Sequence, residues 1–530
     1  MSESGQSRPA PGASLQRMSP PLPASDICEQ ARLSRDARFD GLFFTAVRTT
    51  GIYCRPVCPA PAPKAVNVVY YPNAATAEVA GFRPCLRCRP ELSPSDGHWH
   101  RGDDLVARAL ALIDQGALNE APLASLAERL HIGERQLRRL FVERLGAAPV
   151  GVHGTRRLLF AKQLLTETAL PITEVALAAG FNSVRRFNAV FQDAYRTPPR
   201  DLRKAPPEST GDALTLRLAY RPPYDLPAML DFLRGRALPG IEVVDEVAYT
   251  RVIGTAEAPG WLRVRAWPGR RGEPAPDALR LELHGCAPSH LQDTVQRVRR
   301  MFDLDADPHA IAAHLGHDAR LAPLLRARPG LRLPSGWDGF EIAVRAVIGQ
   351  QVSVAAARTL TARLSQRFGA PLPEAFTAQG FAHLFPTPEV LVDADFDGLG
   401  LIGSRIATIR GIAAAVLDGR VDFDRARTLD DFVERWVALP GIGPWTAQYI
   451  ALRALGHPDA FPAEDLVLQK LLPTDGTRMT ANALRAHAKA WRPWRGYAVF
   501  HLWRDASAAT PARAATPTRT RARSTRSPSP

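Results

Sequence analysis

The pattern of apolar and polar positions changes several times along this chain. Residues 101–204 and again residues 331–505 follow the pattern of helices. Between 213 and 330, alternating runs such as LTLRLAY and ALRLELHG predict an antiparallel sheet with some helix. Within residues 26–97, the run VNVVYY (Val66–Tyr71) predicts a short strand. We therefore expect a multidomain protein that is mainly helical and has α+β parts.

Three segments lack the apolar residues that a folded core requires. Residues 1–25 are rich in Ser, Pro and Gly and are predicted to be disordered. The segment APPESTGD, residues 205–212, is predicted to be a polar linker. Residues 506–530 carry five arginines and no acidic residue. We expect them to form a basic disordered tail that adds weak attraction for phosphates.

Composition and charge narrow the choice of partners. The chain has 530 residues, 45% of them hydrophobic, which is enough for several ordinary globular cores. Its net charge of +14 favours a polyanionic partner, although a generally basic composition is the alternative. No apolar run is long enough for a transmembrane helix, and the N-terminus lacks the apolar stretch of a signal peptide. We expect no membrane partner and a cytoplasmic location, where thiols stay reduced.

Four of the six cysteines fall in two close pairs. Cys54 and Cys58 are separated by three residues, and Cys85 and Cys88 by two. Two such pairs on separate turns can place four thiolates in a tetrahedral shell, which is a geometry typical of Zn2+. Zinc keeps a coordinated thiol deprotonated at neutral pH, so the sulfurs become electron-rich. On spacing alone, a purely structural zinc site is the favoured interpretation.

The residues around these cysteines favour a reactive site instead. The segments TTGIYCRPVCPAP and GFRPCLRC resemble the N-terminal zinc domain of the Ada family, which repairs methyl phosphotriesters in DNA and activates transcription. The resemblance covers about residues 33–92 and implies that Cys54 accepts the methyl group, with Cys58, Cys85 and Cys88 as supporting ligands. Methylation would remove one negative charge and so reduce repulsion from the DNA backbone.

One segment departs from the Ada pattern. The stretch after the second cysteine is basic in that family, whereas here residues 59–64 read PAPAPK. Whether this loop contacts phosphate is therefore open.

Two helix-turn-helix patterns occupy the first helical region. The first spans Leu123–Leu145 with a turn at Ile132, and the second spans Ile172–Arg203 with a turn at Gly180 and with Ser183 as a helix N-cap. The pair resembles the AraC-type DNA-binding domain, which places two recognition helices in successive major-groove segments. A helical bundle with solvated arginines is the alternative. The candidate DNA contacts are the polar residues of the two second helices: Arg135, Arg138, Arg185, Arg186 and Asn188.

A glycine hairpin marks the second helical region. The motif LPGIGPWTAQYIA contains Gly441 and Gly443, which allow a close approach to a DNA phosphate, and the following helix directs its N-terminal amides to the same place. The segment FPAEDLVLQK, which contains Asp465, follows. This pair resembles the helix-hairpin-helix DNA glycosylases. Over about residues 213–505 the chain resembles more closely the AlkA-type 3-methyladenine DNA glycosylases II.

The second resemblance implies roles for individual residues. Trp445, Tyr449 and Trp503 would form an aromatic pocket for a flipped cationic base, and Asp465 would stabilise the oxocarbenium sugar. Gln351 stands where a close relative has an apolar wedge that fills the vacated base stack. Trp445 replaces the Schiff-base lysine of bifunctional relatives, which argues against lyase activity. Core packing is the alternative for each aromatic residue, and a helix N-cap is the alternative for Asp465.

These interpretations combine into one prediction. We expect a DNA alkylation repair protein that binds Zn2+ and double-stranded DNA, with RNA polymerase as a further partner. One alternative is a transcription regulator whose glycosylase half only binds DNA, and another is a glycosylase with a merely structural zinc finger. The predicted segments are 1–25 disordered, 26–97 an Ada-like zinc α/β domain, 101–204 an AraC-type double helix-turn-helix, 213–330 an antiparallel-sheet α+β domain, 331–505 an all-α helix-hairpin-helix glycosylase domain and 506–530 a basic tail.

Overall fold

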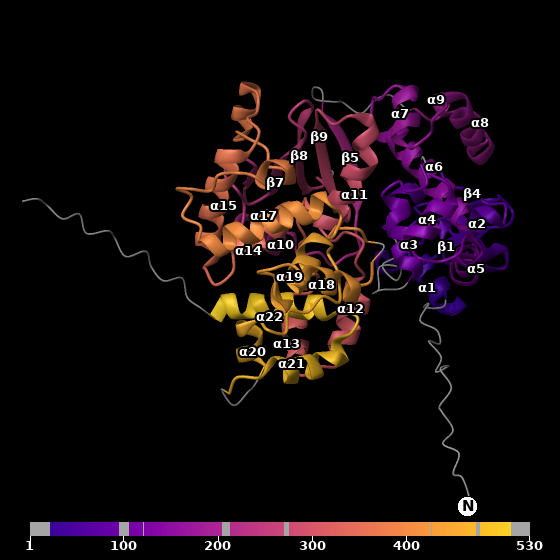
Figure 1. The fold of residues 1–530 in the computed structure, drawn as a ribbon. Coiled ribbons are helices and arrows are strands. Elements are labelled where there is room, and N and C mark those ends of the chain that lie inside the picture. The colour runs from indigo at the N-terminus through magenta and orange to yellow at the C-terminus, as the bar shows by residue number, and fades with distance from the viewer. Residues whose placement is uncertain are drawn as a thin grey trace, which may run out of the picture.

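The computed structural model describes residues 22–94, 105–119, 121–203, 213–269, 275–425, 427–472 and 477–509. Most of the predicted N-terminal disordered segment, the predicted linker and the tail from residue 510 lie outside the described residues. Figure 1 shows helices throughout and two sheets, which confirms the multidomain, mainly helical fold with α+β parts. None of the described helices combines the length and the apolar character that crossing a membrane requires.

The N-terminal part contains a small sheet in the order β3-β1-β2-β4. Strand β1 is antiparallel to β2 and β3, whereas β2 and β4 are parallel, with Tyr53 opposite Pro84. Cys54 and Cys85 each come directly after a residue of this pair, so the register places them beside each other at the same end of β2 and β4. The elements are α1 (Ser25–Ser34), β1 (Phe44–Val47), β2 (Ile52–Cys54), β3 (Val68–Tyr71), α2 (Ala74–Val79) and β4 (Arg83–Pro84), so the predicted strand begins at Val68.

The next part consists of helices and contains both predicted helix-turn-helix units. The helices are α3 (Leu105–Asp114), α4 (Leu123–Arg129), α5 (Glu134–Leu145), α6 (Pro149–Glu167), α7 (Ile172–Ala178), α8 (Val184–Tyr195) and α9 (Pro199–Leu202). Helices α4 and α5 form the first unit, α7 and α8 form the second, and α6 joins them. Helix α8 buries Phe187, Phe191 and Tyr195, which recur at helical spacing on one face. The hydroxyl of Ser183 caps it by accepting from the amide of Arg186 at 3.3 Å.

A five-stranded sheet follows, in the order β5-β9-β8-β7-β6, with every neighbouring pair antiparallel. Strand β8 alternates between buried and partly exposed positions, which is the pattern expected when one face of a sheet is covered. The elements are β5 (Leu214–Ala219), α10 (Leu226–Arg234), β6 (Glu242–Val244), β7 (Ala248–Gly254), β8 (Pro259–Ala266), β9 (Ala278–His284) and α11 (Leu291–Met301).

The C-terminal helices share one large apolar core, in which α14 packs against α15, α17 and α19. The last helix continues past Asp505, the predicted end of the domain, to Ala509. The helices are α12 (Pro308–Leu315), α13 (Leu321–Ala327), α14 (Gly339–Ile348), α15 (Val354–Phe368), α16 (Pro388–Leu391), α17 (Gly403–Leu417), α18 (Leu429–Val437), α19 (Pro444–Ala454), α20 (Leu466–Leu471), α21 (Ala481–His487) and α22 (Arg495–Ala509).

The N-terminal half (described up to residue 203) and the C-terminal half (described from residue 213) share one apolar core. Buried residues of α6, α7 and α8 belong to the same apolar cluster as those of strands β5, β7, β8 and β9 and helix α11. Polar contacts accompany it: the Gln163 side chain donates to the carbonyl of Arg217 at 2.9 Å, and the Arg217 amide donates to the Glu167 carboxylate at 3.0 Å. The halves therefore pack as one body across the junction between α6 and β5 (Figure 1).

Candidate functional site

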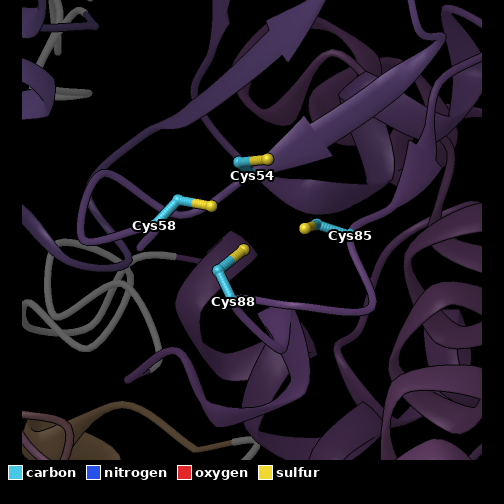
Figure 2. Close-up of side chains that lie close together, drawn as sticks. All are labelled: Cys54, Cys58, Cys85 and Cys88. Atoms are coloured by element: carbon cyan, nitrogen blue, oxygen red, sulfur yellow. The ribbon is translucent and has the colours of Figure 1, made fainter. Parts of the chain in front are cut away.

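Four cysteine sulfurs converge at the edge of the N-terminal sheet. Cys54 ends β2, Cys58 follows in the next turn, and Cys85 and Cys88 follow β4. Their sulfur atoms all lie within 4.8 Å of one another, and Figure 2 shows the side chains pointing toward a common centre. Cys85 and Cys88 are buried, whereas Cys54 and Cys58 are partly exposed. Four thiols in this arrangement fit a tetrahedral Zn2+ ion.

Backbone amides distinguish these four sulfurs. The sulfurs of Cys85 and Cys88 each accept a hydrogen bond from a backbone amide at 3.3 Å, and Cys58 also has a backbone hydrogen bond. Within the described parts of the chain, no backbone amide is hydrogen-bonded to the sulfur of Cys54. Hydrogen bonds to a thiolate stabilise its charge and reduce its nucleophilicity. Among the described residues, Cys54 is therefore the one sulfur of the cluster without a backbone donor.

Two basic side chains hydrogen-bond to the backbone of the loop that carries Cys85 and Cys88. The fully buried Lys162 of α6 donates to the carbonyl of Cys85 at 3.1 Å and to the carboxylate of Glu91 at 2.7 Å. Arg55 donates to the carbonyl of Cys88 at 3.1 Å and pairs with Asp40. Arg55 belongs to the Ada-like segment, but the sequence predicted no role for it or for Lys162. Their partners are distant in the chain, and no local pattern indicates them.

One arginine of the C-terminal half reaches this network. Arg221, which lies between β5 and α10, is 0% exposed. Its Nε atom donates to the carbonyl of Asp40 at 2.9 Å, and its Nη1 atom donates to the carbonyl of Asp305 at 3.1 Å. Asp40 is therefore held by Arg55 through its side chain and by Arg221 through its backbone.

Replacing Arg221 by Met should lower the free energy of unfolding by about 2–4 kcal/mol, because it leaves buried carbonyl groups without a donor. Thermal and urea unfolding measure the effect. The matched control is Arg129→Ala, since Arg129 forms an exposed pair with Asp424 at 3.1 Å between the same two halves. An exposed pair contributes about 0–1 kcal/mol. Equal shifts for the two variants would contradict a structural role for Arg221.

The predicted helix-turn-helix contacts lie on two separate helices. All of these residues are exposed and lie on the solvent-facing sides of α5 and α8: Arg135, Arg138, Arg185, Arg186 and Asn188. Arg138 forms an ion pair with Glu134 at 2.6 Å, one turn earlier on α5. All five side chains are accessible to a nucleic acid.

The predicted aromatic residues are brought together in the C-terminal half. A pocket of about 700 Å³ is lined by residues of α10, α14, α19 and α22, and Trp445, Tyr449, Asp465 and Trp503 are among them. The rings of Trp445 and Tyr449 stack with their centroids 5.1 Å apart, and the Trp503 ring lies 6.3 Å from Tyr449. These aromatic residues are partly exposed and line the pocket, and Tyr449 and Trp503 also pack against the large apolar core.

Asp465 caps a helix and also lies in the wall of the pocket. As the N-cap of α20, its Oδ1 atom accepts from the amides of Val467 and Leu468, each at 3.0 Å. Within the pocket, the indole N–H of Trp445 donates to Oδ2 at 3.1 Å and that of Trp503 to Oδ1 at 3.3 Å. Donors on both oxygens fix the orientation of this carboxylate.

The hairpin lies beside the turn between α14 and α15. Gly441 has a φ of 85°, and a Cβ atom there would lie 2.0 Å from Oγ1 of Thr408. A Cβ at the exposed Gly443 would meet no protein atom within 4 Å, which leaves that side open to a partner. The exposed Gln351 stands in the turn with a φ of 56°. Gln350, which sequence reasoning missed, ties the turn to the hairpin by donating to the carbonyl of Gly441 at 3.1 Å.

Comparison with known protein families assigns most of the chain. Four family models match it: "Metal binding domain of Ada" at 27–91, "Helix-turn-helix domain" at 126–205, "AlkA N-terminal domain" at 215–338 and "HhH-GPD superfamily base excision DNA repair protein" at 344–495. The first match and the four-sulfur cluster agree on the cofactor, which is Zn2+. The second and fourth matches agree on DNA as the partner.

Individual relatives cover either the whole chain or one half of it. The chain is 40% identical over 489 residues to the probable bifunctional transcriptional activator/DNA repair enzyme AlkA of Mycobacterium tuberculosis. This alignment covers 90% of the chain and 95% of the relative. It is 34% identical to DNA-3-methyladenine glycosylase 2 of Escherichia coli, over 54% of this chain and 95% of the relative. It is 38% identical to Ada of Escherichia coli, over 29% of this chain and 41% of the relative. The chain therefore belongs to the family of the bifunctional transcriptional activator/DNA repair enzyme AlkA.

Proposed function

We propose that this chain removes alkylated purines from DNA with its C-terminal half and detects DNA methylation damage with its N-terminal half. The C-terminal half is a DNA glycosylase that hydrolyses the N-glycosidic bond of purines of the 3-methyladenine type. The observation that carries this function is the Asp465 carboxylate, held by the indole N–H groups of Trp445 and Trp503 in the wall of an aromatic pocket.

The pocket supplies the groups that this hydrolysis requires. The damaged nucleotide rotates out of the base stack, and Gln351 occupies the gap from the turn beside the hairpin. Alkylation makes the base a cation, so it leaves as a neutral molecule when the bond to the sugar breaks. Asp465 stabilises the positive charge that develops on the sugar, and water then adds to the anomeric carbon and releases a proton to solvent. Trp445 offers no amine for a Schiff base, so strand cleavage by β-elimination is not expected.

The N-terminal half accepts a methyl group once per molecule. The sulfur of Cys54 attacks the methyl carbon of a methyl phosphotriester, the carbon–oxygen bond breaks, and the phosphodiester leaves with the electron pair. Zn2+, held by Cys54, Cys58, Cys85 and Cys88, keeps the thiols deprotonated when it is bound. The product has one negative charge fewer, which strengthens binding to DNA. The absence of an amide donor to Cys54 among the described residues supports its choice as the acceptor.

The middle helices place the methylated protein at a promoter. Arg135 and Arg138 on α5, with Arg185, Arg186 and Asn188 on α8, contact two successive stretches of DNA through base edges and phosphates. RNA polymerase is the partner that the bound activator recruits. Reduced zinc thiolates and a DNA substrate support a location in the cytoplasm, at the nucleoid.

Incubation with methylated duplex DNA tests the enzymatic function. We expect chromatography to detect free 3-methyladenine, and the DNA to retain abasic sites that break only after treatment with alkali. Strand breaks that appear together with base release would contradict the monofunctional reaction. Binding to methylated DNA with no base release would favour the alternative, a transcription regulator whose glycosylase half only binds DNA.

A further inference from the structure

Two guanidinium groups line the aromatic pocket without a carboxylate in contact among the residues that the structure describes. Arg236 follows α10, and Arg453 lies near the end of α19. Both stack on the ring of Phe232, with their guanidinium carbons 3.8 Å and 4.6 Å from its centroid. Arg453 donates to the carbonyl of Pro334 at 2.9 Å and to the hydroxyl oxygen of Tyr449 at 3.2 Å, and Arg236 donates to the carbonyl of Phe232 at 3.3 Å.

The positive charges of these two arginines are therefore not balanced by their own partners. Arg453 is 4% exposed, and Arg236 is half-buried. Burial lowers the pKa of Arg453 to about 10, so its guanidinium stays protonated at neutral pH. An aromatic ring and neutral oxygens satisfy hydrogen bonds, but a buried cation remains unfavourable until an opposite charge lies beside it. An anion in the pocket would supply that charge.

A neighbouring group of four charged residues is neutral as a whole. Arg345 of α14 pairs with Glu341 at 2.8 Å and with Glu242 at 3.4 Å. Arg251 pairs with the same two carboxylates. Two cations and two carboxylates compensate one another, so these acids are not available to Arg236 or Arg453.

The remaining arginines of the pocket are paired or exposed. Arg504 of α22 pairs with Asp231 at 3.1 Å, and Arg358 of α15 is exposed, where solvent screens its charge. Burial raises the pKa of Asp303 to about 6, and the charge of Arg332 opposes this rise, so these two residues interact. The uncompensated positive charge of the pocket wall is therefore located at Arg236 and Arg453.

We propose that Arg236 and Arg453 bind a carboxylate on the substrate, so that the pocket favours purines whose alkyl group ends in a carboxylate, such as a carboxymethyl group. The proposal rests on the glycosylase function proposed above and names a substrate class for it. The planar guanidinium group, with its fork of N–H donors, matches the geometry of a carboxylate.

The layout of the pocket suits such a substrate. Trp445 and Tyr449 stack on each other beside Asp465 and offer their rings to the cationic purine. The guanidinium carbon of Arg453 lies 5.9 Å from the centroid of Tyr449, so a short alkyl chain on the purine spans the distance to it. The pocket of about 700 Å³ is in the range of about 300–1,000 Å³ that holds drug-sized ligands, which leaves room for the chain.

Three guanines substituted at position 7 separate the effect of charge from that of size. 7-Carboxymethylguanine carries the carboxylate, 7-carbamoylmethylguanine has nearly the same shape without the charge, and 7-methylguanine lacks the chain. Duplexes that carry one of the three are mixed at equal concentrations, and the initial rates of base release, measured by chromatography, give the ratios of kcat/KM. We expect the wild type to release the carboxymethyl base at least about tenfold faster than the carbamoylmethyl base, because hydrogen bonds to a charged group are the stronger ones.

Substitutions of the two arginines test their part in this preference. Arg453→Met and Arg236→Met should each lower the ratio of carboxymethyl to carbamoylmethyl release toward one, and release of 7-methylguanine in the same mixture shows that the variant is folded. Arg234→Met is the matched control, because Arg234 lies two positions before Arg236 but pairs with Asp231 at 2.9 Å and does not line the pocket. Its ratio should remain that of the wild type. Equal release of the two larger bases by the wild type, or an unchanged ratio in both pocket variants, would overturn the proposal.

Binding of the free bases tests the carboxylate site without any catalysis. Quenching of tryptophan fluorescence measures the Kd of 7-carboxymethylguanine and of 7-carbamoylmethylguanine. The Kd of the carboxymethyl base should be at least about tenfold lower, and Arg453→Met should abolish the difference. Equal values of Kd in the wild type would contradict the site. If the wild type releases 7-methylguanine but does not prefer the carboxymethyl base, only the present proposal fails. If it releases none of the three bases, the glycosylase function fails, while the two values of Kd still decide whether the arginines bind a carboxylate.

Discussion

The variant Asp465→Asn should release alkylated bases about a hundredfold to a thousandfold more slowly than the wild type. The carboxylate is expected to face the sugar carbon whose charge grows as the base departs, and a neutral amide cannot stabilise that charge. Trp445 and Trp503 position the carboxylate through their indole N–H groups, and an amide nitrogen facing either donor would lose that hydrogen bond. Release of 3-methyladenine under single-turnover conditions measures the effect on chemistry alone.

Asparagine is chosen because it separates catalysis from folding. Asp465 also caps α20 by accepting from the amides of Val467 and Leu468, and Asn is an equally good N-cap. The melting temperature should therefore change little, whereas Asp465→Ala should lower both activity and stability. Base release by Asp465→Asn at the wild-type rate would show that this carboxylate is not the catalytic group.

The variant Cys54→Ala should abolish methyl transfer from DNA. In the wild type, incubation with DNA that carries methyl phosphotriesters should add one methyl group to the peptide that contains Cys54. In the variant, no cysteine should gain a methyl group, because the remaining sulfurs of the cluster carry backbone hydrogen bonds. Mass spectrometry of the digested protein makes the measurement. Cys286→Ala is the matched control, since Cys286 lies outside the cluster and its loss should leave the transfer intact.

Two results would contradict this assignment in different ways. A methyl group on Cys58 in the wild type would place the acceptor elsewhere in the same cluster. An unmodified wild-type protein, in a reaction where zinc is bound and the damaged DNA is in excess, would favour the other alternative, a glycosylase whose zinc finger is purely structural. Release of 3-methyladenine in the same sample would show that the protein is active and would sharpen that conclusion.

The sequence predicted those features whose signals are local. Helical spacing and a capping serine located the second helix-turn-helix, since Ser183 and the apolar positions of α8 lie within a few residues of one another. Strict alternation predicted β5 and β9 for the same reason. The cysteine cluster followed from spacing, because parallel pairing of β2 with β4 brings the two motifs to one edge.

The features that sequence reasoning missed depend on partners far apart in the chain. Arg221 contacts Asp40 across 181 positions, and Lys162 contacts Cys85 across 77. No local sequence pattern indicates that Arg221 and Lys162 are buried, so from the sequence both are expected to be ordinary solvent-exposed charges. The order of domains was accessible from motifs, whereas the contacts between them were not.

The core shared by α6–α8 and the sheet of β5–β9 has a consequence for how the two activities can be separated. Because buried apolar side chains and the contacts of Arg217 and Arg221 hold the halves together, we expect the two halves to stay associated even if the chain were cut after Arg203. A gene split at that point would encode a heterodimer rather than two independent proteins. Each polypeptide produced alone would expose the apolar residues that it contributes to the shared core, and would depend on the other polypeptide for its solubility.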